Sequence, residues 1–200
     1  ARIVGSEAVS TREVDRLAYA RDAWIRDVLR RRAGEMAAAP EAVVWPGSPE
    51  EVARVLELAD RLGVPVVPFG GGSGRVGGAR PSRGGVVLDL KRMRAIRRLD
   101  EEALVVEAEA GIVGARLEAT LARRGLTLGH APASLHCSTL GGWLATRSAG
   151  QLSTLYGRIE DMTLGIELVS PRGRARRPAW HRTGPALDWA ALVLGSEGCF

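Results

Sequence analysis

A run of glycines directly after an apolar segment is the strongest constraint on how this chain folds. Val64 to Phe69 predicts a buried strand, and the glycine loop, Gly70 to Gly85, follows it at once. Gly72, Gly74 and Gly77 have the G-x-G-x-x-G spacing of a Rossmann turn, but that turn needs a helix to open directly after it. Here Pro, Ser and Arg residues lead instead to a second apolar strand at 86–90. The sequence therefore predicts a long loop and no Rossmann turn, and it contains no Gly-Lys-Ser/Thr of a P-loop.

Consecutive glycines give this loop a specific binding capacity. Without Cβ atoms, successive backbone N–H groups can point into one concavity and bind an anion. A diphosphate fits such a nest, and Ser73 adds a hydroxyl. A flexible surface loop without a ligand is the alternative, and the glycines by themselves leave it open.

The remaining elements alternate without a regular repeat. The patterns predict amphipathic helices between Thr11 and Arg32, a helix capped by Ser48 that ends at Gly63, and a helix at 113–124. Further strands are expected at 42–45, 96–99, 103–108 and 162–170, then a hydrophilic stretch and a short helix at 187–194.

This order favours an α+β fold with two small lobes over a doubly wound sheet. One lobe would hold a small mixed sheet with helices, and the other a second sheet. We expect an N-terminal helical segment at residues 1–39 and one domain at residues 40–200.

The charge of the chain is basic but dispersed. The net charge is +5 and the pI about 10.2, with Lys91 the only lysine and the arginines interleaved with 23 acidic residues. No aromatic interleaving of the kind that stacks bases accompanies them, so no nucleic-acid partner is expected. An anionic substrate or cofactor is compatible with this charge.

Targeting and redox signals are sparse. Cys137 and Cys199 have neither metal-ligand spacing nor a disulfide framework, and no apolar run approaches the roughly 18 residues of a membrane span. We expect a cytoplasmic piece of a longer protein without a metal site, in which peripheral membrane contact is allowed.

A second motif block carries a family resemblance. From Gly129 the chain reads GHAPASLHCSTLGGWLATRSAG, and Tyr156 opens the block YGRIED. Both blocks resemble the alkylglycerone-phosphate synthases, whose PCMH-type FAD-binding domain belongs to the superfamily of vanillyl-alcohol oxidase and p-cresol methylhydroxylase. The resemblance extends to segments 68–74, 109–112, 170–173 and 195–198, and so covers residues 40–200. Trp143 and the Ile159-Glu160-Asp161 triplet favour these synthases over glycolate and D-lactate dehydrogenases.

The resemblance implies a set of FAD contacts. Segment 68–74 would hold the diphosphate, segment 134–142 would line the ribityl chain and the flavin, and two further segments would complete the site. The implied residues are Pro68, Phe69, Gly70, Gly71, Gly72, Ser73, Gly74, Ser134, Ser138, Thr139, Gly141, Gly142, Thr146, Arg147, Ser148, Glu197 and Gly198. We expect the glycine loop and the Ser-Thr/Gly-Gly stretch to enclose one diphosphate. None of the three histidines lies in the glycine loop, which favours non-covalent FAD.

Three positions depart from the family pattern. Ala133 stands where the family commonly has aspartate, Ser148-Ala149 reverses the usual order, and Ala186 replaces an acidic residue. These departures bear on the activity of the subfamily more than on FAD binding.

The implied activity is exchange of the acyl group of acylated dihydroxyacetone phosphate for a long-chain alcohol. The alternatives are an FAD-dependent 2-hydroxy-acid dehydrogenase and a non-catalytic flavin-binding module. The resemblance implies a small-molecule or lipid substrate, and it places the catalytic residues outside this segment. A homodimer formed through other regions of the protein is compatible with it.

Several residues that could be read as catalytic are given structural roles. We expect His130 to hydrogen-bond locally, Cys137 to be buried as a small packing residue, and Trp143 and Tyr156 to pack in the core or at the flavin edge.

The other candidates for chemistry lack partners in the sequence. His136 and His181 have no companion at metal-ligand spacing. Glu160 and Asp161 are expected on a strand, where adjacent side chains point to opposite faces and cannot act together.

Overall fold

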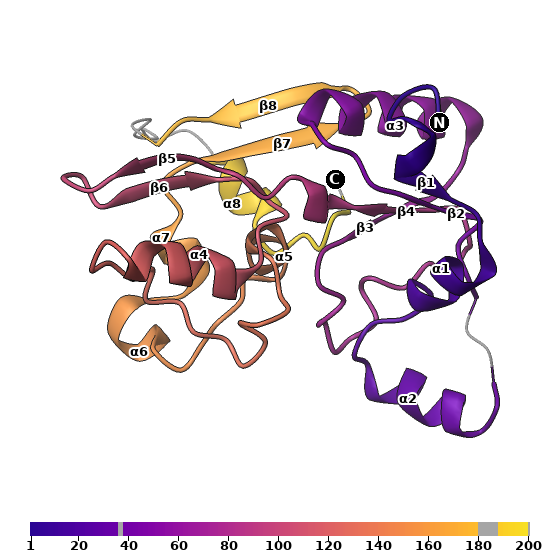
Figure 1. Cartoon of the computed structure of the whole chain (residues 1–200), viewed down its shortest axis with the longest axis horizontal. Helices are drawn as coiled ribbons and strands as arrows, with labels where there is room; N and C mark the ends of the chain where they lie inside the picture. Colours follow the sequence, from indigo (N-terminus) through magenta and orange to yellow (C-terminus); the bar gives the residue numbers. More distant parts are fainter. Residues whose placement is uncertain (36–37, 180–187, 200) are drawn as a thin grey trace. The chain divides into compact units, whose positions relative to one another are not determined.

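The computed structural model describes residues 1–35, 38–179 and 188–199, which fold into two compact units. The first unit comprises Ala1–Met93 with Ser170–Arg172, and the second comprises Arg94–Val169 with Gly173–Phe200. Both units mix helices and strands (Figure 1), which confirms the α+β class and the two lobes. The domain boundary expected at Pro40 stays a prediction.

A four-stranded sheet forms the centre of the first unit. Its strands run in the order β1 (Val9–Ser10), β2 (Ala42–Val44), β4 (Val86–Asp89) and β3 (Val66–Phe69). β2 and β3 are both parallel to β4, which lies between them, and β1 is antiparallel to β2. Val87 pairs with Val43 on one side and with Val67 on the other. Because β2 and β4 are buried along most of their length, apolar residues follow one another in their sequences.

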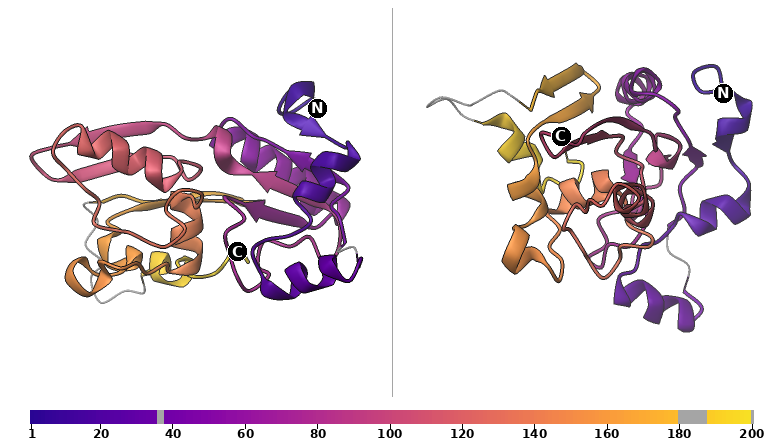
Figure 2. Two further views of the ribbon diagram at one scale, coloured as in Figure 1. Left: turned by 60° about the horizontal axis from the view of Figure 1, so that its bottom comes forward. Right: turned by 60° about the vertical axis from the view of Figure 1, so that its left-hand side comes forward.

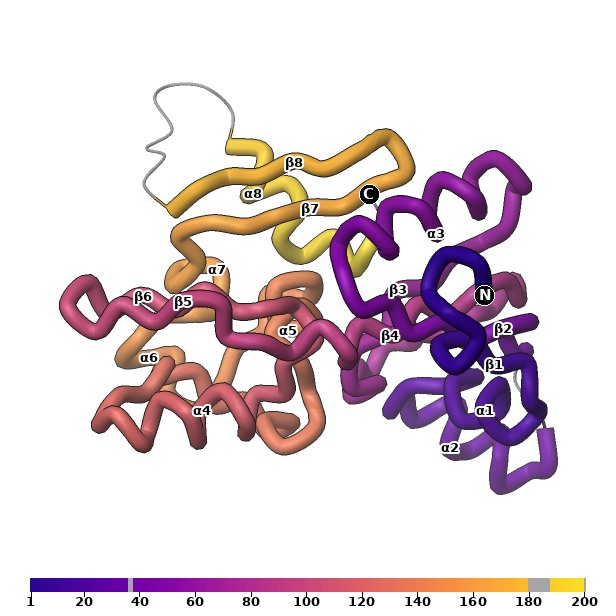
Figure 3. The backbone as a smooth tube through the Cα atoms, turned by 45° about the horizontal axis from the view of Figure 1, so that its top comes forward, coloured from indigo at the N-terminus to yellow at the C-terminus, as the bar shows by residue number. Residues whose placement is uncertain are grey.

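Helix α3 (Pro49–Leu62) begins and ends where its sequence predicts. The Ser48 hydroxyl accepts a hydrogen bond from the Glu51 amide at 3.2 Å, and Pro49 occupies the first turn. Gly63 ends the helix in the left-handed region, with a φ of 63°. Val52 and Ala59 of this helix are buried. α3 lies on one face of the sheet and α1 on the opposite face (Figures 1 and 3).

Of the one or two helices predicted near the N-terminus, the structure has two, but their apolar face is not the buried one. They are α1 (Glu13–Ala18) and α2 (Ile25–Arg32), preceded by the short turn η1 (Ser6–Ala8). Ile25 and Leu29 are exposed, whereas Asp22 and Asp27 are 2% exposed. The expected apolar packing is therefore wrong for α2, because an ion pair of Asp27 turns the polar side of this helix inward.

The second unit is built around one small core. The hairpin of β5 (Ile96–Asp100) and β6 (Val105–Ala108) packs on α4 (Gly114–Ala122), as both views of Figure 2 show. The core residues are Ile112, Leu117, Leu121, Trp143 and Ile159. The unit continues through α5 (Leu140–Thr146), α6 (Ser153–Tyr156), α7 (Ile159–Met162), β7 (Ile166–Ser170), β8 (Gly173–Arg177) and α8 (Trp189–Val193).

Several elements of this unit were not expected from the sequence. The stretch after Gly173, predicted as irregular, is strand β8, which pairs with β7 although four of its five residues are Gly or Arg. The Gly- and Ser-rich region 129–157 contains helices α5 and α6. In both cases tertiary pairing overrides a weak local preference.

The expected strand position of Glu160 and Asp161 is also wrong. Both residues lie in helix α7, where the Asp161 carboxylate accepts a hydrogen bond from the Arg158 amide at 2.8 Å. Glu160 pairs with the Arg158 guanidinium at 3.2 Å. Both carboxylates thus interact with Arg158, the residue that precedes the helix. No helix in the part of the chain that the structure describes has both the length and the apolar character of a membrane span.

Candidate functional site

The glycine loop has a conformation that only glycine adopts easily at several of its positions, among them two in its first half. Gly72 and Gly77 have φ values of 63° and 87°. A Cβ at Gly72 would lie 2.6 Å from the Phe69 ring, which is buried at the carboxyl end of β3. A side chain at Gly72 would therefore be strained by its backbone angle and would also displace Phe69.

Four successive backbone donors in the first part of this loop are not used by the protein. Among the described residues, the amides of Gly71, Gly72, Ser73 and Gly74 find no hydrogen-bond acceptor, and neither does the Ser73 hydroxyl. Gly71, Gly72 and Ser73 are half-buried. Backbone donors in folded proteins nearly always have partners, so four successive amides without one at a strand end are available to bind an anion.

A buried carboxylate fixes the start of the loop. Asp89, at the carboxyl end of β4, is completely buried and accepts hydrogen bonds from the Tyr19 hydroxyl at 2.5 Å and from Lys91 Nζ at 2.6 Å. Lys91 Nζ also donates to the Gly70 carbonyl at 2.7 Å. Burial and the Asp89 carboxylate raise the pKa of Tyr19, so this phenol keeps its proton. Through Lys91, the carbonyl of Gly70 is thereby held to Asp89 at the end of β4.

The second motif block of the sequence surrounds α5, in the other unit. The Thr139 side chain caps α5 by accepting from the Gly142 amide at 3.3 Å. The Ser138 hydroxyl donates to the Ser134 carbonyl at 2.8 Å and accepts from Trp143 Nε1 at 2.7 Å. Ser138 and Thr139 are almost fully buried, so both hydroxyls are used inside the protein.

The glycines in and near this block differ in what a Cβ atom would contact. A Cβ at Gly141 would lie 2.8 Å from the Ala110 side chain, so this glycine allows the start of α5 to pack against Ala110. Gly114 is similarly required by the Trp143 ring, which a Cβ would approach to 2.3 Å. Near Gly142, only the Thr139 hydroxyl lies within 4 Å of an added Cβ. Of Gly141 and Gly142, only Gly142 therefore has little protein beside the position of its missing side chain.

The carboxyl end of α5 is joined to the Gly-Ser-Glu-Gly segment. Arg147, with a φ of 48°, donates to the carbonyls of Leu194 and Ala191 at 2.9 and 2.6 Å. The Gly195 amide donates to Leu144, and the Glu197 amide donates to Ala145 at 2.8 Å. The structure therefore brings together two site segments that lie about fifty residues apart in the sequence.

His130 lies in the interior of the same unit. It is 1% exposed, its Nε2 lies 3.2 Å from the Ser148 hydroxyl, and its ring meets the Trp143 ring edge-on at 4.8 Å. Burial lowers the pKa of His130, and the carboxylates of Glu160 and Glu118 partly oppose this effect. The local hydrogen bond expected for His130 is present.

Comparison with known families decides the identity of the fold. A family model described as "FAD binding domain" matches residues 40–177. The chain belongs to this FAD-binding domain family. Its cofactor is FAD.

Within this family, the chain is similar to several alkyldihydroxyacetonephosphate synthases. An alkyldihydroxyacetonephosphate synthase from Dictyostelium discoideum is 40% identical over 177 residues, which are 87% of this chain and 29% of the relative. The corresponding synthase from Trypanosoma brucei brucei is 37% identical over 180 residues, or 88% and 29% of the two chains. A solved structure of an alkyldihydroxyacetonephosphate synthase superposes with a TM-score of 0.88 at 35% identity, covering 96% of this chain and 36% of that one. The resemblance read from the sequence is confirmed, and the chain spans about three tenths of the length of these curated relatives.

The expected site residues differ in whether their side chains already have hydrogen-bond partners within the protein. The side chains of Ser138, Thr139, Thr146, Arg147 and Ser148 make hydrogen bonds within the protein. The Ser134 hydroxyl has no hydrogen-bond partner in the described part of the chain, like the loop amides. The expectation that both segments enclose one diphosphate stays a prediction.

Sequence reasoning missed Lys91 and misplaced Cys137. Lys91 is the only lysine, and its position directly after the strand that neighbours the glycine loop was the signal that could have found it. Cys137, expected to be buried, is exposed, because it lies in a turn whose inward position is taken by Ser138. Ala186 and His181 lie outside the described residues.

The first prediction separates a structural from a cofactor-binding serine. Ser138→Ala leaves the buried indole N–H of Trp143 without an acceptor, and we expect the FAD-free chain to lose about 1–3 kcal/mol of unfolding free energy. Ser134→Ala removes a hydroxyl without a partner and should change it by less than about 0.5 kcal/mol. Urea unfolding measures both, and equal stability of the two variants would contradict the assignment.

The unfolding free energy of the chain should depend on pH through His130. Because the pKa of His130 is lowered in the folded state, the unfolded chain binds the proton more readily below about pH 6.5. The stability contributed by neutral His130 is therefore present above that pH and is lost as the pH falls. We expect the unfolding free energy to decline between about pH 7.5 and about pH 5.5, and to decline less in His130→Gln. The control, His136→Gln, replaces an exposed histidine and should keep the wild-type slope.

Proposed function

We propose that this chain is the FAD-binding portion of a flavoenzyme of the alkylglycerone-phosphate synthase type. The whole protein would exchange the acyl group of acylated dihydroxyacetone phosphate for a long-chain alcohol. The observation that carries the proposal is the agreement of two comparisons, 40% identity to one synthase and a TM-score of 0.88 with the structure of another. The alternative flavin oxidoreductases receive less support.

The cofactor contacts are part of the same proposal. The four free amides from Gly71 to Gly74 would donate to the diphosphate of FAD, with the Ser73 hydroxyl beside them. Pro68, Phe69 and Gly70 would support this cradle from the strand end. The residues fit a dinucleotide, because an anion would satisfy donors that the protein leaves unpaired.

The segment around α5 would supply the second set of contacts. Ser134 has a free hydroxyl, and Gly142 has an open side for the flavin end of the cofactor. Ser138, Thr139, Gly141, Thr146, Arg147 and Ser148 would act by holding this backbone in place, and Glu197 and Gly198 by closing on the end of α5. Binding would be non-covalent.

The role of the chain would be to bind and orient the cofactor. When bound, FAD supplies the reactive ring, and the protein supplies position and electrostatics. The basic balance of the chain, with a net charge of +5, suits a substrate that carries a phosphate. Catalytic groups are assigned to the parts of the protein outside this chain.

The remaining partners follow from the same reading. We expect a small-molecule or lipid substrate and no nucleic acid. Ile25 and Leu29 are exposed on α2 beside Arg26 and Arg30, which supports peripheral contact with a lipid surface. The unpaired cysteines Cys137 and Cys199 support a reducing, cytoplasmic location. A homodimer through regions outside this chain completes the proposal.

Turnover of the full-length protein tests the proposed activity. Incubation with an acylated dihydroxyacetone phosphate and a long-chain alcohol should yield the alkyl product and free fatty acid, detected by mass spectrometry. Anaerobic bleaching of the flavin by D-lactate or glycolate would instead identify a 2-hydroxy-acid dehydrogenase. Bound FAD that none of these compounds alters would identify a non-catalytic module, and either result rejects the synthase.

Substitution of one glycine tests the diphosphate cradle. Gly72→Ala introduces a Cβ that would lie 2.6 Å from the Phe69 ring, and we expect the FAD Kd of the full-length protein to rise at least about tenfold, which is about 1.4 kcal/mol. Gly63→Ala is the matched control, since Gly63 has the same φ of 63° but nothing within 4 Å of an added Cβ. Equal FAD Kd values for the two variants, measured by flavin fluorescence, would reject the cradle.

A further inference from the structure

The segment of residues 19–27, which we call the support segment, lies against the glycine loop. The Tyr19 ring meets the Phe69 ring edge-on at 4.8 Å, at the point where β3 passes into the loop. Farther along, the Ala23 amide donates to the Gly74 carbonyl at 2.9 Å. Two contacts, one at each end of the run of free amides, fix where this run begins and ends.

An aromatic and a charged contact extend the support beyond the glycines. A Cβ at Gly77 would lie 3.1 Å from the Trp24 ring, so the loop passes directly over this indole. The Arg80 guanidinium also lies over the Trp24 ring, 5.2 Å from its centre. Trp24 therefore touches the loop at two positions three residues apart.

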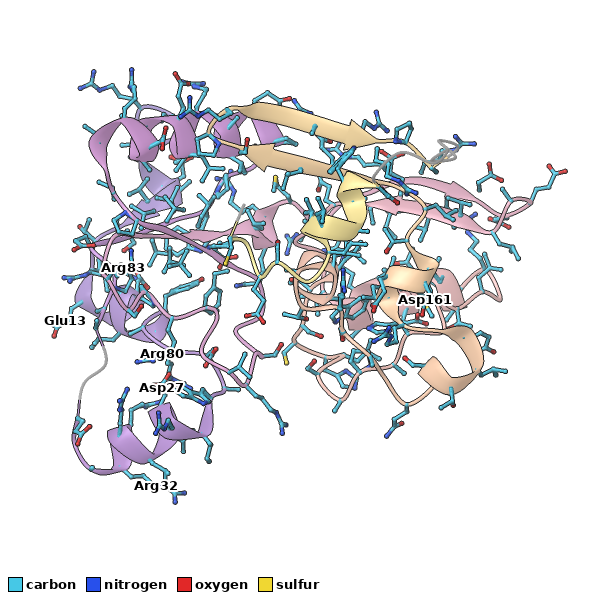
Figure 4. The ribbon with its side chains drawn as sticks, turned by 180° about the vertical axis from the view of Figure 1, so that it is seen from behind. Glu13, Asp27, Arg32, Arg80, Arg83 and Asp161 are labelled. Carbon is cyan, nitrogen blue, oxygen red and sulfur yellow. The ribbon has the colours of Figure 1, made fainter. Side chains whose placement is uncertain are left out.

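An ion pair with little exposure closes the arrangement. Arg80 Nε lies 2.8 Å from Asp27 Oδ2, and the exposed fractions of the two side chains are 15% and 1%. The N–H group is not aimed at the oxygen, so the contact is an ion pair without an aligned hydrogen bond. Figure 4 shows Asp27 on α2 and Arg80 in the loop facing each other. A buried carboxylate that lost this partner would be strongly unfavourable.

Asp22 connects the support segment to the loop in a further way. One of its carboxylate oxygens accepts from the Trp24 amide at 2.9 Å, which holds the start of α2. The other oxygen is buried with no hydrogen-bond partner among the described residues, and it lies 3.6 Å from the position of a Cβ at Gly74. A buried carboxylate oxygen without a donor does not stabilise the fold, so this contact with the loop is not explained by stability alone.

We propose that residues 19–27 are a positioning element for cofactor binding, which holds the glycine loop in the conformation that presents its free amides to the diphosphate of FAD. This inference rests on the proposed role of the glycine loop. The matched family region begins at residue 40, so the support segment lies in front of it in the sequence. Tyr19, Trp24 and Asp27 act through the loop, and they are positioning residues.

Such an element is needed because the loop has little order of its own. Glycine has more backbone freedom to lose than any other residue, and a mobile loop must lose that freedom when the ligand binds. Contacts that order the loop before binding remove this penalty from the binding step. Loss of the support segment's ion pair should therefore weaken FAD binding without changing the spectrum or the turnover of the saturated protein.

The test uses the full-length protein with Asp27→Asn and Arg80→Gln, singly and together. We expect each single variant to raise the FAD Kd about tenfold and the double variant to raise it no further, since both remove one interaction. At saturating FAD the flavin spectrum and kcat should match the wild type. Arg30→Gln is the matched control, because Arg30 pairs with Glu35 on the exposed end of α2 at 3.9 Å and does not contact the loop.

The outcomes separate this inference from the proposed function. Weaker FAD binding in Gly72→Ala together with wild-type binding in Asp27→Asn would keep the diphosphate cradle and overturn the positioning role. If Asp27→Asn also lowers the thermal midpoint of the FAD-free protein, Arg80→Lys decides. This variant keeps a charge for Asp27 but loses the planar group over Trp24, and we expect a raised FAD Kd at an unchanged midpoint. A wild-type FAD Kd in Arg80→Lys would overturn the inference.

Discussion

The chain between Phe69 and Val86 has neither helix nor strand, so its backbone must be held by other contacts. Asp89 and Lys91 hold its first carbonyl, and the support segment holds its middle. What these contacts leave free is a row of amide donors at the end of a parallel strand. The end of the central sheet and the N-terminal helices of the first unit thus hold this one loop while leaving four of its donors unpaired.

Much of the fold could be predicted because several signals are local. The Ser48 cap, the Gly63 stop and the apolar strands depend on neighbouring residues alone, and each was found where expected. Strand β8 could not be predicted, because four of its five residues are Gly or Arg and its order comes from pairing with β7. The inward turn of Asp27 depends on Arg80, which is more than fifty residues away in the sequence.

The candidate site shows a different limit of sequence reasoning. A motif predicts which residues are needed, but it does not tell which partner uses them. Ser134 and Ser138 stand in one block and have the same side chain, yet one hydroxyl is free and the other holds Trp143. Gly141 was expected among the residues that line the cofactor, and the structure shows it making room for Ala110. Only packing distinguishes these roles, and no pattern of spacing contains that information.

The ion pair between α2 and the loop also bears on where this domain can be cut for expression. A piece begun at residue 40, where the family match starts, would keep Arg80 and Asp89 but lose Asp27 and Tyr19. Two buried polar groups would then face water or an apolar wall in place of their partners. A truncated product designed from the family boundary would thus lack the N-terminal contacts of the glycine loop, and a start upstream of β1 (Val9–Ser10) preserves them.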